Sequence, residues 1–390
     1  MSFNPQGLLN RVVTEIPPSG IRKFFDIAAE MKDAISLGVG EPDFVTPWHI
    51  RDKGIHSLQK GQTHYTANKG LKELREEISN YLDRRFNLKY DTLTQTIVTV
   101  GGSEAIDLVF RAVIDPGDEV LVPEPSFVCY QPLTRLAGGV PVPITTKAEN
   151  NFKITPDELK SAITSKTKVL VLPYPNNPTG GIMTKEDLEA IAEVLRDTNI
   201  LVLSDEIYAE LTYGRKHCSI AEIDGMYERT VLVSGFSKAY AMTGWRLGYA
   251  CGHPDIISAM TKIHQYGIMS APTIAQFAAI EALKNGDADI EAMRDEYNDR
   301  RRLIVGGFNA MGLDCFEPEG AFYAFPCIKS TGLSSGEFCE KLLYDQKVAV
   351  VPGTAFGESG EGHVRCSYAY SLDSINEALN RIETFVRKTK

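Results

Sequence analysis

The sequence has few features of an exported, membrane-inserted or nucleic-acid-binding protein. Its seven cysteines are odd in number, dispersed and without a Cys-x-x-Cys pair, which argues against a disulfide framework or a zinc site. No apolar run approaches the length that spans a bilayer, and the first residues lack a basic stretch followed by an apolar one. The formal net charge of −10 gives no general attraction to nucleic acid or anionic membranes. We therefore expect a cytoplasmic protein that binds small molecules, with no metal ion, nucleic acid or membrane as partner.

What the sequence does have is an alternation of short apolar stretches with amphipathic segments. Apolar residues at helical spacing predict helices over 71–82 and 185–196. Strands that alternate with helices indicate a mostly parallel sheet with helices on both faces, in a chain of 390 residues that is long enough for a second domain. The expected strands span residues 97–100, 119–122, 168–172, 200–204 and 230–233.

Candidate polar and aromatic groups follow these strands one by one. Because the carboxyl ends of parallel strands meet at one edge of a sheet, ligands of α/β proteins bind there. We therefore expect these residues to gather around one crevice. They are Gly102, Ser103, Phe127, Asn177, Asp205, Tyr208 and Lys238.

The stretch 234–248 carries the most specific chemistry. It places Lys238 at the end of a strand and Arg246 eight residues later. A lysine that is desolvated or close to another cation is neutral part of the time and attacks carbonyl carbons, while an arginine fork suits a phosphate. Gly102 and Ser103 at the start of a helix form a second anion-binding element. Pyridoxal phosphate has both the aldehyde and the phosphate that this pattern indicates.

A buried carboxylate would complete such a site. If Asp205 is buried, it stays ionised only when paired, and the pyridinium N–H is its natural partner. A protonated ring accepts electrons when the α-proton of a substrate leaves, and Lys238 would carry that proton. Asn177 and Tyr208 are candidates for hydrogen bonds to the ring's 3-oxygen, and Phe127 for stacking on the ring face.

A series of motifs stands in order along nearly the whole chain, at 38–44, Tyr65, 101–103, 175–180, 204–208, 235–248 and 363–365. Together they resemble the signatures of class I aminotransferases of the pyridoxal-phosphate fold type I superfamily, in the bacterial aspartate and aromatic branch. The resemblance implies ping-pong transfer of an amino group from an L-amino acid to a 2-oxo acid. It also implies a large α/β cofactor-binding domain over 48–290 with a mostly parallel seven-stranded sheet flanked by helices. A smaller α+β domain would cover 291–390, with residues 1–47 as an arm that completes it.

The resemblance also assigns roles to individual residues. Lys238 is the Schiff-base lysine and Asp205 the pyridinium partner. Arg365 takes the substrate α-carboxylate as a bidentate fork, assisted by Asn177 and the Gly40 backbone. The 3-oxygen is bound by Asn177 and Tyr208, and the phosphate by Gly102, Ser103, the Glu104 backbone and Arg246. Tyr65 reaches the phosphate of the neighbouring subunit, which implies a homodimer with shared active sites.

Three departures from the family pattern bear on substrate choice. Many members have a serine where this chain has Gly235, so Ser237 is expected to supply that hydroxyl. The aspartate-preferring bacterial branch often has a lysine at the Ser103 position, and its absence weakens an aspartate assignment. Phe127 stands where tryptophan is common and keeps a stacking surface.

Rival functions differ in how far the motifs exclude them. A pyridoxal-phosphate carbon–sulfur lyase, or a related eliminase on the same fold, shares the lysine motif and stays open as the alternative. A transcription regulator would need a fused DNA-binding module, for which the N-terminal arm is too short. Serine acyl transfer fails because the sequence around Ser237 lacks the glycine that closes a nucleophile elbow.

Overall fold

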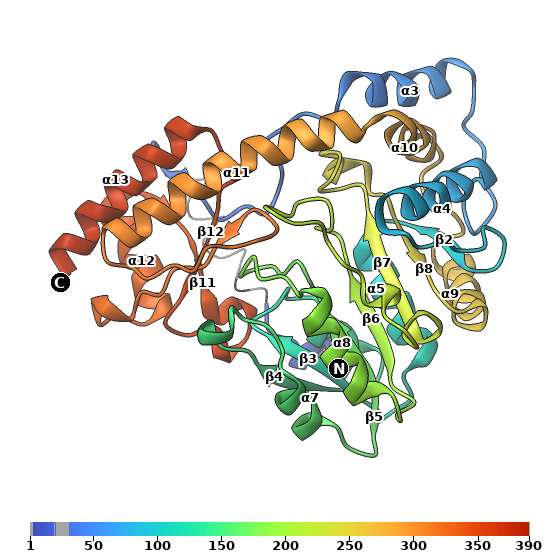
Figure 1. The fold of residues 1–390 in the computed structure, drawn as a ribbon, viewed down its shortest axis with the longest axis horizontal. Coiled ribbons are helices and arrows are strands. Elements are labelled where there is room, and N and C mark those ends of the chain that lie inside the picture. Colours follow the sequence, from blue (N-terminus) through green and yellow to red (C-terminus); the bar gives the residue numbers. More distant parts are fainter. Residues whose placement is uncertain (1–2, 19, 21–30, 390) are drawn as a thin grey trace.

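The centre of the fold is a seven-stranded sheet in strand order β2-β8-β7-β6-β5-β3-β4. The computed structural model describes residues 3–18, 20 and 31–389. β8 is antiparallel to both of its neighbours and the other strands are parallel, which confirms the expected mostly parallel sheet (Figure 1). The strands are β2 (Thr96–Thr99), β3 (Glu119–Glu124), β4 (Val140–Thr145), β5 (Thr167–Leu172), β6 (Leu201–Asp205), β7 (Thr230–Gly235) and β8 (Gly248–Cys251).

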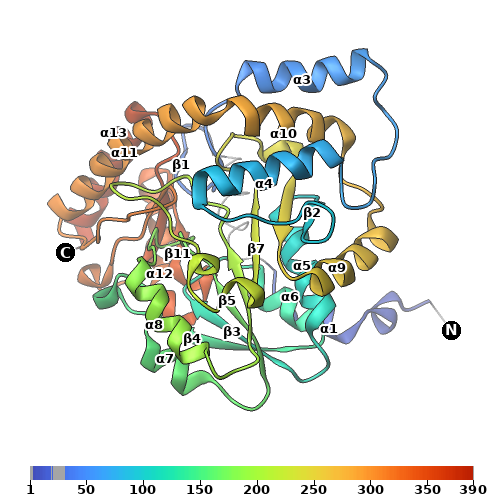
Figure 2. The ribbon, with the colours of Figure 1, turned by 45° about the vertical axis from the view of Figure 1, so that its right-hand side comes forward.

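Helices cover both faces of this sheet, because its central strands are buried on both sides and need apolar cover. On one face α5, α6 and α9 pack against the strands, and on the other face α4, α7, α8 and α10 do so. α3 lies along α10 (Figure 2). The bounds are α3 (Trp48–Gln59), α4 (Lys72–Phe86), α5 (Gly102–Val113), α6 (Tyr130–Leu136), α7 (Pro156–Ala162), α8 (Lys185–Leu195), α9 (Pro254–Gly267) and α10 (Thr273–Asn285).

A second core lies beside the sheet and combines both ends of the chain. The long helix α11 runs from the large sheet region to this smaller body (Figure 1). β9, β11 and β12 form a three-stranded antiparallel sheet, while β1 from the N-terminal region pairs in parallel with β10. The bounds are α1 (Arg11–Glu15), β1 (Ile35–Ser36), α11 (Asp287–Ala310), β9 (Tyr323–Ala324), α12 (Ser335–Gln346), β10 (Val348–Ala349), β11 (Val351–Pro352), β12 (Val364–Ser367) and α13 (Leu372–Thr389).

The five strands expected from the sequence all form, within one or two residues of their expected bounds. Two further strands, β4 and β8, carry no clear signal in the sequence. β4 alternates prolines with apolar residues, and prolines are tolerated there because β4 is an edge strand. β8 is only four residues long and contains glycine.

Within the described residues, no helix is long and apolar enough to cross a membrane. In that same part of the chain, no cluster of histidine, cysteine and acidic side chains could hold a metal ion. All seven cysteines are free thiols.

Candidate active site

A cavity of about 360 Å³ opens at the carboxyl ends of the parallel strands. Its walls come from the large sheet on one side and from the N-terminal region and the smaller body on the other. The structure therefore gathers most of the predicted residues in one place, as the strand-end argument requires. The predicted residues that line it are Gly40, Gly102, Ser103, Phe127, Asn177, Asp205, Tyr208, Ser237, Lys238, Arg246 and Arg365.

Lys238 follows β7 and reaches across the cavity. Its Nζ donates to the backbone oxygen of Gly40 at 2.7 Å and lies 5.9 Å from the Tyr208 ring centroid. Burial lowers the pKa of Lys238 to about 8; Arg365 and Arg246 act in the same direction, and the nearby Glu41 carboxylate opposes them. The amine is thus neutral for a useful fraction of the time near neutral pH, as a nucleophilic lysine must be.

Asp205 is the last residue of β6 and is only 7% exposed. The Tyr130 hydroxyl donates to its Oδ2 at 2.7 Å, and the Ile207 backbone N–H donates to its Oδ1 at 3.2 Å. Burial raises the pKa of Asp205 to about 6, although both hydrogen bonds favour the ionised form. This carboxylate is held in place yet still suits a partner that carries a proton or a positive charge.

Arg365 comes from β12 and is 2% exposed. Its Nη1 donates to Asn177 Oδ1 at 2.8 Å and its Nη2 donates to the Gly38 oxygen. Its guanidinium lies 4.5 Å from the Tyr323 ring centroid, and burial lowers its pKa. Among the residues described, Arg365 forms no ion pair, and its Nε is buried without a hydrogen-bond partner. A buried guanidinium without a carboxylate is costly, and a planar anion would relieve that cost.

Arg246 lies against the start of α5. Gly101 has a positive φ of 78°, which favours glycine, and its lack of a Cβ lets Arg246 Nη2 approach to 2.7 Å from the place that a Cβ would take. Arg246 Nη1 donates to the Thr243 oxygen at 3.0 Å, and no described carboxylate forms an ion pair with it. The free N–H groups at the start of α5, the Ser103 hydroxyl and this guanidinium together form a site suited to a phosphate.

The glycine at position 235 has a physical cause. A Cβ there would lie 3.0 Å from both the Gly248 Cα, in the paired strand β8, and the backbone oxygen of Leu247 just before it, so a side chain would require these backbone atoms to move by a few tenths of an ångström. Ser237, two residues later, is buried and is among the hydroxyl-bearing residues that line the cavity.

Two predicted residues do not line the cavity. The Glu104 carboxylate accepts hydrogen bonds from the Val100 backbone N–H and from His264 Nδ1, the latter at 2.6 Å. The carboxylate therefore stabilises the start of α5 and is not directed into the cavity. The Glu104 backbone lies in the first turn of α5, next to the cavity-lining Ser103. Tyr65 is 80% exposed on the surface.

Sequence reasoning missed several residues of the cavity, chiefly Tyr130 and Tyr323. Tyr130 begins α6 three residues after Phe127, and this spacing is the only signal that could have indicated it. Tyr323 lies on the short strand β9, and its hydroxyl is 2.8 Å from the Tyr208 hydroxyl. Glu41 and Thr243 also line the cavity and are hydrogen-bonded to each other.

Comparison with known proteins gives a consistent result. The family model described as "Aminotransferase class I and II" matches residues 32–382. The Bacillus subtilis (strain 168) protein YugH is 55% identical over 381 residues, which cover 98% of this chain and 99% of that protein. An aspartate aminotransferase of Pyrococcus abyssi is 48% identical over 378 residues, covering 96% and 97%. The crystal structure of an aromatic aminotransferase from Pyrococcus horikoshii OT3 superposes with a TM-score of 0.90 at 44% identity, covering 94% of this chain and 99% of that one.

Proposed function

The chain belongs to the class I and II aminotransferase family and is a pyridoxal-phosphate-dependent transaminase, and from this premise we propose that the cavity around Lys238 is its active site. The reaction moves an amino group from an amino acid to a 2-oxo acid. The relatives named above do not favour the lyase alternative, because the Pyrococcus abyssi protein and the Pyrococcus horikoshii structure both carry the name of an aminotransferase.

The side chains in the cavity fit this cofactor. Pyridoxal phosphate has an aldehyde, a phosphate and a ring nitrogen that binds a proton. The cavity offers one amine of lowered pKa in Lys238, one guanidinium beside a helix start in Arg246, and one buried carboxylate in Asp205. The observation that carries the proposal is that these groups and the unpaired Arg365 line a single cavity, although they come from different strand ends.

The residues divide the work of the reaction. When bound, the cofactor supplies the carbonyl carbon that receives the amino group and a ring that withdraws electrons. Asp205, held by Tyr130, keeps the proton on the ring nitrogen. Lys238 Nζ would take the α-proton from the substrate and deliver a proton to the cofactor carbon that carried the aldehyde. Phe127 offers a face for stacking, and Tyr208 offers a hydroxyl to the ring oxygen.

Arg365 and Asn177 are proposed to bind the α-carboxylate that all amino acid and 2-oxo acid substrates share. Arg365 is already oriented by Asn177 and by the Tyr323 ring, so little rotamer freedom is lost when an anion binds. The Gly40 backbone lies on the same side of the cavity. Such a site binds the α-carboxylate whatever the side chain of the substrate.

We also propose that the protein is a homodimer with shared active sites. α3 and the segments near it expose large apolar side chains, including Trp48, Ile55, Leu58 and Tyr65, and Tyr266 is 85% exposed. The Asn68 amide donates to the Met269 oxygen at 2.8 Å, which joins two of these segments into one surface. A second copy of the chain is the occupant that this surface suits. Tyr65 would then reach the cavity of the partner subunit.

The domain division and the cellular location belong to the same proposal. Residues 48–290 would form the cofactor-binding domain, and residues 1–47 would complete the small domain over 291–390. The pairing of β1 with β10 supports the last point. Seven free thiols suit the reducing cytoplasm.

The test uses the full-length protein incubated with pyridoxal phosphate. We expect a new visible absorbance band that changes when an amino donor is added and returns with a 2-oxo acid. A panel with aspartate, aromatic and aliphatic donors would identify the substrate class. Absence of the band, or release of ammonia without any 2-oxo acid acceptor, would contradict the proposal.

Shared active sites need a separate experiment. We expect Lys238→Ala and Tyr65→Phe variants, each weakly active alone, to regain activity when unfolded together and refolded as mixed dimers. Monomers in sedimentation, or no gain on mixing, would argue against the shared site.

A further inference from the structure

One wall of the cavity is a loop, residues 38–46, that three cations hold. Arg365 donates to the Gly38 oxygen, and Lys238 donates to the Gly40 oxygen at 2.7 Å. The third cation, Arg300 on α11, has its Nη1 2.8 Å from both carboxylate oxygens of Asp43. The first two cations line the cavity and the third does not.

This difference matters when ligands bind. Under the proposed function, Lys238 is taken by the cofactor and Arg365 by the substrate carboxylate. Both then have less hydrogen-bonding capacity for the backbone oxygens of loop 38–46. The ion pair between Asp43 and Arg300 uses no cavity-lining side chain. It can therefore hold this part of the loop whether or not cofactor and substrate are bound.

The surroundings of Arg300 make the pair stronger than a surface ion pair. The Arg300 side chain is 4% exposed. Its guanidinium lies 5.1 Å from the Phe44 ring centroid and 5.5 Å from that of Tyr297, and these two rings meet edge to face. Glu296 also binds Arg300 from one turn earlier on α11. Low exposure and two aromatic faces limit the screening that weakens exposed pairs.

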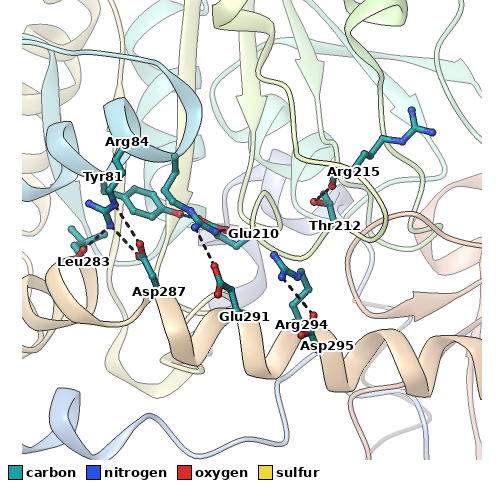
Figure 3. Close-up of polar contacts among 11 residues, drawn as sticks. Tyr81, Arg84, Glu210, Thr212, Arg215, Leu283, Asp287, Glu291, Arg294 and Asp295 are labelled. Atoms are coloured by element: carbon teal, nitrogen blue, oxygen red, sulfur yellow. Dashed lines mark hydrogen bonds and ion pairs between the residues drawn. The ribbon is translucent and has the colours of Figure 1, made fainter.

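The helix that carries Arg300 is anchored at its other end to the cofactor side of the site. Arg84 on α4 forms an ion pair with Asp287 at 3.0 Å (Figure 3). Arg85, the next residue of α4, bridges Glu291 of α11 and Glu210. Glu210 lies two residues after Tyr208 in the sequence. α11 therefore connects the segment around Tyr208 to loop 38–46.

We propose that Asp43 and Arg300 are positioning residues for substrate binding, which keep Gly40 and Gly38 at the cavity wall while ligands occupy Lys238 and Arg365. The proposal rests on the assignment of Arg365 to the substrate carboxylate. The pair touches neither substrate nor cofactor. Its loss is thus expected to weaken binding of substrates and to leave the proton transfer at Lys238 largely unchanged.

The test compares Asp43→Asn with a matched control whose arginine partner lies on the same helix, α11. In Asp43→Asn, Arg300 keeps Glu296 as a partner, so no buried charge is left alone. Glu317→Gln removes a similar pair from the next residue, Arg301, at 2.9 Å and outside loop 38–46. We expect KM for donor and acceptor to rise about tenfold in Asp43→Asn, with kcat within about threefold of wild type, and both to stay within about twofold in Glu317→Gln.

Further variants separate positioning from general stability. The double variant Asp43→Asn/Arg300→Met should have the same KM as Arg300→Met alone, because the two residues act as one unit. Asp43→Glu keeps a carboxylate and should return KM toward wild type, and it serves if Asp43→Asn folds poorly. Additive losses in the double variant, an equal rise in Glu317→Gln, or a fall in kcat at constant KM would overturn the proposal.

Calorimetry with unreactive acids makes the result independent of turnover. With the cofactor-loaded proteins we expect Kd for maleate or 3-phenylpropionate, whichever binds wild type, to rise about tenfold in Asp43→Asn and to stay constant in Glu317→Gln. An equal Kd in both variants sinks the positioning role even if wild type is an active transaminase. Wild type that transfers no amino groups sinks the proposed function, whatever these affinities show.

Discussion

The two walls of the cavity are built in different ways. Asp205 and Lys238 stand at or just after the ends of neighbouring buried strands, whose register pairs Asp205 with Val233. The opposite wall, with Gly40, Tyr323 and Arg365, comes from a loop and two short strands far apart in the sequence. The first wall is fixed by a sheet that is buried on both faces. The second wall depends on side-chain hydrogen bonds and ion pairs between segments.

This contrast teaches where rigidity is used. Under the proposed function, the groups that meet the cofactor are carried by the ends of adjacent strands. Pairing and burial of these strands hold the relative positions of the groups most firmly. Groups that must admit and release substrates are carried by segments that can shift together. If this is right, substitutions on the sheet wall should mainly change kcat, and those on the opposite wall should mainly change KM.

The largest effect is expected at Lys238. Under the proposed roles, Lys238→Ala removes both the amine that holds the cofactor and the group that moves the proton, so turnover should fall by at least about 10⁴-fold. The visible band on adding pyridoxal phosphate should be lost in an absorbance titration. Transamination at the wild-type rate would refute the assignment of this lysine.

Asp205 tests the sheet wall without removing the cofactor's attachment point. Asp205→Asn cannot hold a proton on the ring nitrogen through a negative charge, so kcat should fall by about 10²–10³-fold while the cofactor still binds. Steady-state kinetics and a binding titration separate the two effects. An unchanged kcat would remove the electronic role of this carboxylate.

Arg365 tests the opposite wall. Arg365→Ala leaves Asn177 and the Gly38 oxygen without their donor, and we expect kcat/KM to fall by about 10²-fold for every amino donor, mainly through KM. Kinetics with an aspartate, an aromatic and an aliphatic donor check this. A defect limited to one donor would assign Arg365 to the substrate side chain.

The smallest effect is expected at Tyr130, which acts on Asp205 through one hydrogen bond. Tyr130→Phe should lower kcat by about tenfold or less. Because the hydroxyl favours the ionised carboxylate, its loss raises the pKa of Asp205, and the acid limb of the pH–kcat profile should move to higher pH. Tyr368→Phe, which removes a buried hydroxyl bonded to the Ala321 oxygen at 3.1 Å, is the control. An equal pH shift in that control would argue against a specific role for Tyr130.

The same contrast explains what the sequence could predict. The sheet wall was accessible because each functional residue follows a recognisable apolar strand, and parallel strands bring their ends together. The strand order and β8, which runs against its neighbours, were not accessible, because they depend on pairing between segments distant in the chain. Tyr130 and Tyr323 were missed for a similar reason. The hydrogen-bond partners of their hydroxyls, Asp205 and Tyr208, lie 75 and 115 residues away in the sequence. Only the packing of the folded chain brings each pair into contact.

Asn177 belongs to the sheet wall, and its neutral amide accepts a hydrogen bond from Arg365 of the opposite wall, as one of several bonds that join the two walls. Its neutrality has a consequence for evolution and for engineering. An aspartate here would differ by a single heavy atom, yet it would give Arg365 a permanent internal counterion in place of the substrate carboxylate that we propose Arg365 binds. A single-nucleotide change from an asparagine to an aspartate codon would thus make the protein compete with its own substrate for Arg365. The neutral amide of Asn177 avoids this competition.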